Sequence, residues 1–273
     1  MPNSAFSGGL GPAAAGGKAG SVAPPGASRV LVAVAHGSAD PRASATVAEL
    51  AAVARQRSPG LDLRTAFLGH APPSLPQVLS TIEADREVAV LPLLLTAAYH
   101  SKTDIPRMLA RLPRPGVSYG ATLGPHPLLL TALDRRLAEA LPISGDGAHQ
   151  NPAQTAVVIA AAGSSDPEAN ATIARLAARW QARAGWYAVR PAFASAAEPS
   201  PAAAVSALLR DGAPRVVVAT YLLAPGLFAD RIRQSTLAAG AAAVSPALGA
   251  CVEVADVLLD RFTETGSQRR TAA

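Results

Sequence analysis

The chain contains a segment that occurs twice, and the two copies differ at one informative position. Residues 30–41 (VLVAVAHGSADP) align with residues 156–167 (AVVIAAAGSSDP), so the two copies start 156 − 30 = 126 residues apart. The glycine, serine, aspartate and proline that follow the apolar run are kept in both copies. His36 of the first copy, in contrast, aligns with Ala162 of the second.

A second pair of segments shows the same loss of a histidine. Residues 93–105 (LLLTAAYHSKTDI) align with residues 221–232 (YLLAPGLFADRI), which places His100 opposite Phe228. A residue that only supports the fold should be needed in both halves, whereas a residue of a functional site is needed only where that site survives. The repeat therefore predicts two similar domains with one histidine-based site in the first.

Short apolar runs alternate with amphipathic segments along both halves. In the first half we expect strands at 29–35, 62–67, 87–95 and 117–123, helices at 41–56, 74–84, 105–112 and 127–141, and a loop at 96–104. Asp40 followed by Pro41 is typical of a helix start, with an N-cap and a proline at the first helical position. Strands that alternate with helices in this way predict a parallel, doubly wound α/β sheet in each half.

Chain length and local composition give the expected domain boundaries. A chain of 273 residues has room for about two domains. We expect a disordered tail rich in Gly, Ala, Pro and Ser at residues 1–28, a first domain with the metal site at 29–141 and a polar linker at 142–154. A degenerate second domain at 155–262 and a frayed tail at 263–273 follow.

Composition excludes several classes of protein. The net charge is +5, but there is no dense basic run and lysine occurs only at Lys18 and Lys102, so a nucleic-acid platform is not expected. A single cysteine, Cys251, excludes an internal disulfide framework. No apolar run is long enough for a membrane span, and residues 1–28 lack the apolar stretch of a signal peptide. The sequence thus predicts a cytoplasmic globular protein.

Both unmatched histidines fall where a parallel sheet binds its ligands, at the carboxyl ends of the first and third expected strands. If these strands are adjacent, the imidazoles of His36 and His100 can face one cavity. Neutral imidazoles suit Fe, Co, Ni, Cu or Zn, and they also act as bases near neutral pH. His70 precedes a proline loop and fits a surface position, and His126 lies at an expected helix start, where it could cap the helix or contact a substrate.

Other familiar constellations are missing from the sequence. There is no GxxxxGK[ST] loop, which argues against ATP-driven chemistry, and no GxGxxG after the first strand, which argues against a bound dinucleotide. There is no GxSxG elbow around Ser38, which argues against a hydrolase nucleophile. A phosphohistidine mechanism would favour an arginine directly before His36, where Ala35 stands.

Four segments together resemble the sirohydrochlorin chelatases of the CbiX type, in their long two-domain form. These segments are HGSADPRA (36–43), FLGHAPPSL (67–75), LPLLLTAAYHSKTDIP (91–106) and LGPHP (123–127). The resemblance extends from about residue 29 to residue 262. It implies an α/β fold of two tandem chelatase-like (flavodoxin-like) domains, each a small parallel sheet flanked by helices.

The resemblance also implies an activity, which is the ATP-independent insertion of Fe²⁺ into sirohydrochlorin with loss of two protons. His36 and His100 would bind the metal or accept the pyrrole protons, and no cofactor beyond the substrate Fe²⁺ or Co²⁺ is expected. The residues expected to contact the substrate and its carboxylates are Ser38, Arg42, Lys102, Arg107 and His126. Gly69 stands where the family often has an acidic metal ligand, and His70 is a candidate to compensate for it.

Three other functions stay open at this stage. The metal could be Co²⁺ on the route to cobalamin, or the protein could carry a metal or tetrapyrrole without turnover. A hydrolase that uses His36 and Ser38 is a third reading, which the missing acid partner and elbow disfavour. Expected partners are sirohydrochlorin and a divalent metal, without nucleic acid or membrane, and a monomer is expected because the second domain can act as the partner of the first.

Overall fold

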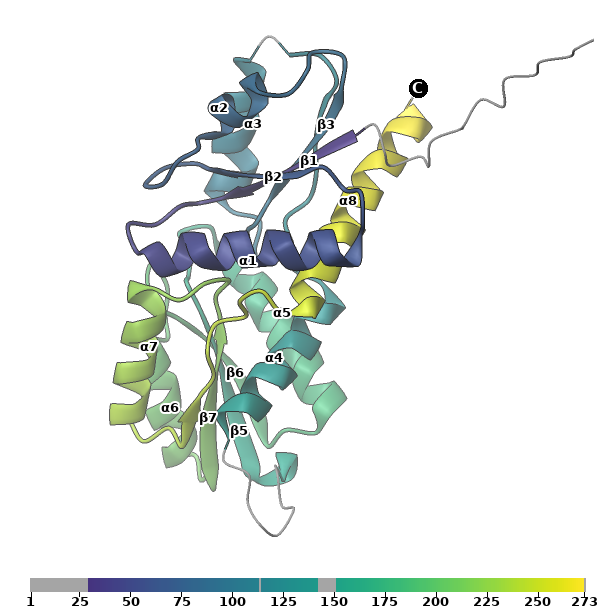
Figure 1. Ribbon diagram of the computed structural model, residues 1–273. Helices are drawn as coiled ribbons and strands as arrows, with labels where there is room; N and C mark the ends of the chain where they lie inside the picture. Colours follow the sequence, from purple (N-terminus) through teal and green to yellow (C-terminus); the bar gives the residue numbers. More distant parts are fainter. Residues whose placement is uncertain (1–28, 113, 142–150, 273) are drawn as a thin grey trace, which may run out of the picture.

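The computed structural model describes residues 29–112, 114–141 and 151–272 and shows two α/β units stacked end to end (Figure 1). The first half contains β1 (Arg29–Ala35), α1 (Pro41–Arg57), β2 (Leu63–Phe67), α2 (Leu75–Ser80), β3 (Glu87–Pro92), the π-helical turn η1 (His100–Asp104), α3 (Ile105–Ala110), β4 (Val117–Tyr119) and α4 (Pro127–Ala140). The second half contains η2 (Pro152–Gln154), β5 (Thr155–Ala161), α5 (Pro167–Ala184), β6 (Ala188–Phe193), α6 (Pro201–Arg210), β7 (Arg215–Tyr221), α7 (Leu227–Ala238), β8 (Ala243–Val244) and α8 (Val252–Ala272).

Each half forms one parallel sheet of four strands. The strand order is β2-β1-β3-β4 in the first sheet and β6-β5-β7-β8 in the second. The predicted fold class, with two tandem α/β units, is therefore confirmed. The first and third strands of each half are adjacent, since β1 pairs with β3 and β5 pairs with β7. In the first half this pairing brings the carboxyl ends that precede His36 and His100 to neighbouring positions on one sheet edge.

Alternate residues of each central strand enter two different cores. In β1, Leu31 and Ala33 pack with α1 and α8, whereas Val30 and Val32 pack with α2 and α3. All four are almost completely buried, as expected for a parallel strand covered on both faces. The cluster under α1 continues without a break into the second half, so the two units share one apolar core.

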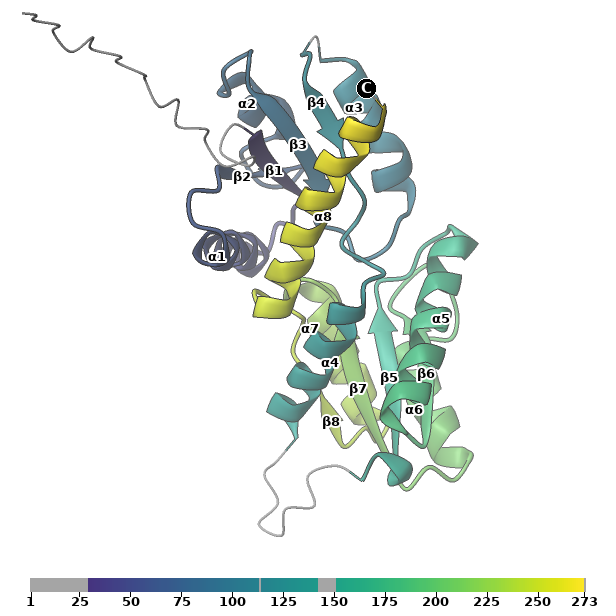
Figure 2. The same cartoon turned by 90° about the vertical axis from the view of Figure 1, so that its right-hand side faces the viewer.

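The last helix of each half covers the sheet of the other half. In two perpendicular views, α8 (yellow) lies beside the first sheet and α4 lies in the second unit (Figures 1 and 2). Consistent with the views, α8 contacts α1 and β3, whereas α4 contacts β7 and β8. The expected domains 29–141 and 155–262 follow the sequence repeat. In the folded molecule, however, α4 of the first domain packs on the second sheet and α8 of the second domain packs on the first.

The expectation of a frayed tail from Thr263 is wrong, because α8 continues to Ala272. Thr265 is buried and its hydroxyl donates to the carbonyl oxygen of Arg261 at 2.7 Å. Arg29 at the start of β1 lies over the Phe262 ring, 4.1 Å from its centroid, and ties the helix to the first sheet. Of residues 263–267, Thr265 is buried, whereas Thr263, Glu264 and Ser267 are exposed, so this mostly polar sequence gives little signal for a helix.

The other two expected non-globular segments fall largely outside the described residues. The expected tail 1–28 lies wholly outside them, as does 142–150 of the expected linker. Residues 152–154 of that linker form the short helix η2, which leads directly into β5. Within the described ranges, no helix is both long and apolar enough to cross a membrane.

Candidate functional site

A tight turn after β1 presents His36 at the sheet edge. Gly37 has φ +90°, and a Cβ there would lie 1.7 Å from the carbonyl oxygen of Gly69. The Gly69 N–H donates to the His36 carbonyl oxygen at 3.1 Å, which joins this turn to the loop after β2. Only glycine fits such a close approach with a left-handed backbone. The turn then leads through Ser38 into α1, which Asp40 caps.

The same turn in the second half shows which of these residues belong to the scaffold. Ser38 Oγ accepts a hydrogen bond from the Asp40 N–H at 3.0 Å, and Ser164 Oγ accepts one from the Asp166 N–H at 3.0 Å. Ser38 makes no hydrogen bond to an imidazole among the described residues and does not line the pocket described below. It was expected to contact substrate, but the structure gives it a turn-forming contact that the half without histidines shares.

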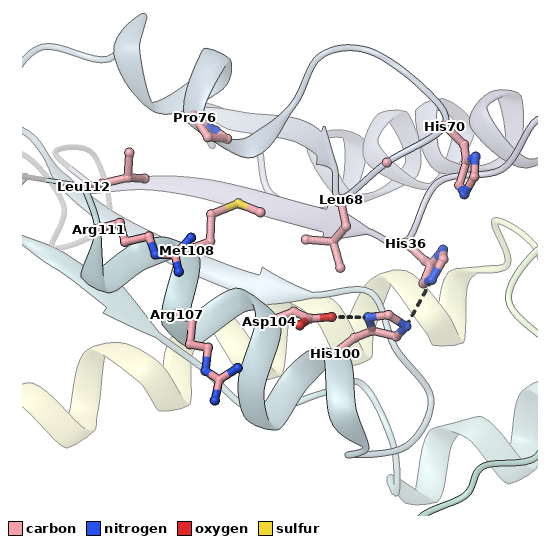
Figure 3. Close-up of a pocket in the computed structure, with 11 residues that line it drawn as sticks. His36, Leu68, His70, Pro76, His100, Asp104, Arg107, Met108, Arg111 and Leu112 are labelled. Atoms are coloured by element: carbon pink, nitrogen blue, oxygen red, sulfur yellow. Dashed lines mark hydrogen bonds and ion pairs between the residues drawn. The ribbon is translucent and has the colours of Figure 1, made fainter.

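His100 lies on a π-helical turn that follows β3, within the segment that was expected to be a loop. Its Nδ1 lies 2.6 Å from Oδ2 of Asp104, which is one helical turn further on. Its Nε2 lies 3.1 Å from Nε2 of His36, and the two rings meet edge to face with centroids 4.5 Å apart (Figure 3). Single-turn π segments of this kind often occur at functional sites.

The hydrogen bonds around the two rings leave room for one cation between them. Nδ1 of His100 faces a carboxylate oxygen at 2.6 Å, which assigns the hydrogen of this ring to Nδ1. Its Nε2 then directs a lone pair at Nε2 of His36. With its hydrogen on Nε2, His36 donates a hydrogen bond across the 3.1 Å separation; with its hydrogen on Nδ1 toward the Gly37 carbonyl oxygen, the two Nε2 lone pairs can hold one cation between them. Two nitrogen ligands about 2.05 Å from one ion lie about 2.9 Å apart at a right angle and about 3.3 Å apart at a tetrahedral angle. The observed separation of 3.1 Å falls between these values.

The imidazole pair opens into a pocket of about 600 Å³ between the loop after β2 and helix α3. Its lining residues are His36, Leu68, Gly69, His70, Pro76, His100, Asp104, Arg107, Met108, Arg111 and Leu112 (Figure 3). Asp104, Met108 and Arg111 were not identified from the sequence. The signal for Asp104 was its spacing of four residues from His100, which is meaningful only if the segment is helical.

His70 lines the same pocket but lies outside the metal-binding distance of the pair. Its ring is stacked parallel to that of His36 with centroids 6.4 Å apart. Its backbone has φ +61°, and the equivalent Ala196 of the second half has φ +59°, so the conformation belongs to the scaffold. The described residues contain no group of three His, Cys, Asp or Glu side chains that could hold one ion. The structure therefore brings two imidazoles together, those of His36 and His100, and His70 lies apart from them.

Two of the residues expected to contact the substrate form ion pairs between the halves of the molecule. Lys102 Nζ lies 2.7 Å from Oδ2 of Asp166, the cap of α5. Arg42 lies 2.6 Å from Asp40 and 2.6 Å from Asp230, which is on α7. Hydrogen bonds from Lys102 and from the backbone lower the pKa of Asp166. Neither Arg42 nor Lys102 lines the pocket.

His126 is also absent from the pocket lining. It caps α4, where its Nδ1 accepts a hydrogen bond from the Leu128 N–H at 3.3 Å. Its Nε2 lies 3.7 Å from Asp260 on α8. Burial lowers the pKa of His126, which favours the neutral ring that this cap requires. Of the two roles that the sequence left open for His126, the structure shows the capping contact.

Comparison with known proteins places the chain in a family. The family model described as CbiX matches twice, over residues 30–140 and 156–265. Together the two matches cover most of the chain and coincide with the two halves of the repeat. The chain belongs to the CbiX family, and both halves are members of it.

Relatives and solved structures agree with this assignment. A sirohydrochlorin cobaltochelatase of Priestia megaterium is 28% identical over 207 residues, which are 74% of this chain and 66% of the relative. A sirohydrochlorin ferrochelatase of Bacillus subtilis is 29% identical over 151 residues, which are 54% of this chain and 55% of the relative. These alignments therefore span less than two thirds of the relatives' own lengths.

The structural comparison covers nearly the whole fold. SirB from Bacillus subtilis with Fe³⁺ has a TM-score of 0.73 and 24% identity over 89% of this chain and 97% of SirB. CbiX, described as the terminal enzyme for siroheme biosynthesis in denitrifying bacteria, has a TM-score of 0.66 and 22% identity over 86% of this chain and 99% of its own. At these identities the likeness shows that the fold is shared.

Proposed function

We propose that this protein inserts a divalent metal ion into sirohydrochlorin, with Fe²⁺ as the first candidate. The observation that carries the proposal is the pair of Nε2 atoms, 3.1 Å apart, on two histidines that line one pocket in a CbiX-family fold. Family membership supports the substrate, since relatives of this chain are named sirohydrochlorin chelatases.

In the proposed reaction, the two imidazoles hold the substrate ion weakly enough to release it. Two neutral nitrogen ligands leave coordination positions open for the pyrrole nitrogens. Asp104 accepts the Nδ1 hydrogen of His100 and so keeps its Nε2 lone pair directed at the ion, as carboxylates do for metal-binding histidines. Two pyrrole N–H bonds break as the ring nitrogens bind the ion. One of the two protons is taken up between the vacated Nε2 atoms, and the other leaves to solvent.

Co²⁺ is the second candidate for the metal ion, because one of the relatives is named a cobaltochelatase. One relative is named a cobaltochelatase and another a ferrochelatase, and imidazole ligands do not separate Fe²⁺ from Co²⁺ strongly. Cobalt insertion therefore stands as the alternative reaction at the same site.

The test is anaerobic absorbance of sirohydrochlorin mixed with Fe²⁺ or Co²⁺, with and without the protein. We expect faster metallation with the protein than without it, and the ratio of rates for the two ions identifies the preferred metal. Binding of the tetrapyrrole with no acceleration for either ion would contradict the proposal and indicate a carrier instead.

The same proposal includes several finer properties. The enzyme would be a lyase that needs neither ATP nor a cofactor beyond the substrate ion, so metallation should proceed in a mixture without nucleotide. It would act as a monomer, because the second half already occupies the place of a partner, and light scattering at assay concentration should give the mass of one chain. We place it in the cytoplasm, as expected from the sequence, and cell fractionation tests this.

A further inference from the structure

Two arginines line the histidine pocket without an acidic partner: Arg107 on α3, and Arg111, the residue at the carboxyl-terminal cap of that helix. Arg107 and Arg111 are exposed, and neither side chain makes a hydrogen bond or ion pair with any residue that the structure describes. They are four residues apart, so their side chains share one helix side and their charges repel each other. An uncompensated pair of cations in a pocket indicates an anionic ligand.

Most other arginines of the described ranges are used structurally. Arg57 and Arg135, for example, form ion pairs with carboxylates of α8. Arg179, Arg190 and Arg231 are also without a partner among the described residues, but none of them lines the histidine pocket. What distinguishes Arg107 and Arg111 is that they share one pocket.

The repeat provides an internal comparison for these two positions. If the alignment is continued from Ile105 and Ile232, Arg107 corresponds to Gln234 and Arg111 to Ala238. The half that lost both histidines has thus also lost both cations. A role in folding alone would not explain this joint loss, because α3 and α7 follow the equivalent strands β3 and β7 of the two sheets.

The pocket has a metal-binding end and a cationic end. Asp104, the last residue of η1, is next to the imidazoles. Arg107 on α3 and Arg111 at its carboxyl-terminal cap lie progressively further from them, with Met108 between the two arginines (Figure 3). The opposite wall includes the apolar side chains of Leu68 and Pro76. A ligand that reaches both ends needs an apolar body, a metal-accepting group and acidic substituents. A guanidinium recognises a carboxylate with two parallel hydrogen bonds, which an ammonium cannot do.

We propose that Arg107 and Arg111 bind carboxylate side chains of the tetrapyrrole and thereby orient it over the imidazole pair. This inference rests on the proposed function and extends it, because it assigns substrate recognition to α3. Arg42 and Lys102, which are nearer to the histidines in sequence, are engaged in ion pairs between the halves. The arginine pair makes the site selective for tetrapyrroles with free acids over the same ring with esterified acids.

The test replaces each arginine by the residue at the equivalent position of the second half. Arg107→Gln, Arg111→Ala and the double variant are compared with Arg179→Ala, which removes an unpaired arginine outside the pocket. Metallation rates are measured against sirohydrochlorin concentration with Co²⁺. We expect KM to rise about fivefold for each arginine removed, with kcat within about twofold, since the side chains are exposed. Arg107→Lys should raise KM above the wild-type value, but less than Arg107→Gln does.

Two further measurements separate failure of the arginine site from failure of the proposed function. With the methyl ester of sirohydrochlorin, wild type and double variant should have the same KM, because no carboxylate remains. If wild type metallates sirohydrochlorin and the double variant keeps its KM, the inference is overturned. If wild type shows no metallation, the proposed function fails separately, and fluorescence titration with metal-free sirohydrochlorin then decides. Weaker binding by the double variant supports the arginine site, and unchanged binding overturns it.

Discussion

At the scale of single residues, the contact between His100 and Asp104 explains why this histidine faces His36. The carboxylate lies 2.6 Å from Nδ1 across one turn of η1 and fixes which ring nitrogen carries the hydrogen. Both histidines could be predicted from their loss in the second half of the sequence. Asp104 could not, because residues 96–104 were expected to form a loop, and a loop gives no reason for residues four apart to meet.

Replacing Asp104 by Asn should weaken metal binding while the fold is kept. The amide has the shape of the carboxylate but not its charge, so the Nε2 lone pair of His100 becomes a poorer donor. We expect the Kd for Co²⁺ to rise about 10–100-fold, as is usual for the outer partners of metal ligands. Calorimetric titration of Co²⁺ measures this, with Asp211→Asn, an exposed carboxylate of the second half, as control. An unchanged Kd would show that Asp104 does not orient the ring.

Introducing a carboxylate at Gly69 should strengthen metal binding. A Cβ at this position would meet no atom within 4 Å, and the backbone is not left-handed, so a glutamate fits without strain. Gly69 lines the pocket beside His36, so the new carboxylate can act as a third ligand. We expect Gly69→Glu to lower the Kd for Co²⁺ at least about tenfold. The matched variant Gly69→Gln should have a much smaller effect, and equal effects of both variants would argue against direct ligation.

At the scale of elements, the turn between β1 and α1 is where the sequence was most informative. The repeated glycine, serine and aspartate build the same turn in both halves, and the helix after each begins at the expected proline. The ends of other elements were harder to predict. The helix after Ser74 ends at Ser80 and not near Ala84 as expected. The sequence could not show this end, because local propensity does not reveal which residues pack on the sheet.

Two glycines with similar backbones should respond differently to alanine. Gly37 and Gly60 have φ +90° and φ +85°, but only at Gly37 would a Cβ collide with backbone, 1.7 Å from the Gly69 oxygen. We expect Gly60→Ala to lower the free energy of unfolding by about 1 kcal/mol from backbone strain alone. Gly37→Ala should lower it by at least about 3 kcal/mol, since the turn must open. Urea unfolding of both variants checks this, and equal losses would contradict the described turn.

At the scale of the whole molecule, the two halves are joined more closely than a tandem repeat requires. They exchange their last helices, share one core and are bridged by ion pairs beside the site. None of this was visible in the sequence. Arg42 and Lys102 were assigned to substrate because they lie near the histidines along the chain, and only the packing of the halves brings them to Asp230 and Asp166.

The contact between the exchanged helices should make stability depend on pH. Arg135 on α4 lies 2.6 Å from Glu253 on α8. Burial raises the pKa of Glu253, but hydrogen bonds from Arg135 outweigh it, so the pKa lies below its usual value of 4.5. A carboxylate with a depressed pKa in the folded state stabilises fully above the unfolded pKa, and this contribution is lost as the pH falls through the folded value.

Urea unfolding of wild type and Glu253→Gln tests this dependence. Wild type should be the more stable protein at pH 7, and the difference should shrink as the pH is lowered from about 4.5. Glu49→Gln, which removes an exposed carboxylate of α1, serves as control and should show no such difference. A difference between wild type and Glu253→Gln that stays constant down to pH 3 would contradict an ionised Glu253 in this contact.

The central claim is that one imidazole pair, in one half of a duplicated fold, delivers the metal. The most direct measurement is the anaerobic rate of sirohydrochlorin metallation for wild type, His36→Ala and His100→Ala, with His126→Asn as a control that keeps the helix cap. We predict that each of the first two variants loses at least about 100-fold in rate, whereas the control stays within about twofold of wild type. If both alanine variants metallate at the wild-type rate, the imidazole pair is not the catalytic site and the account is wrong.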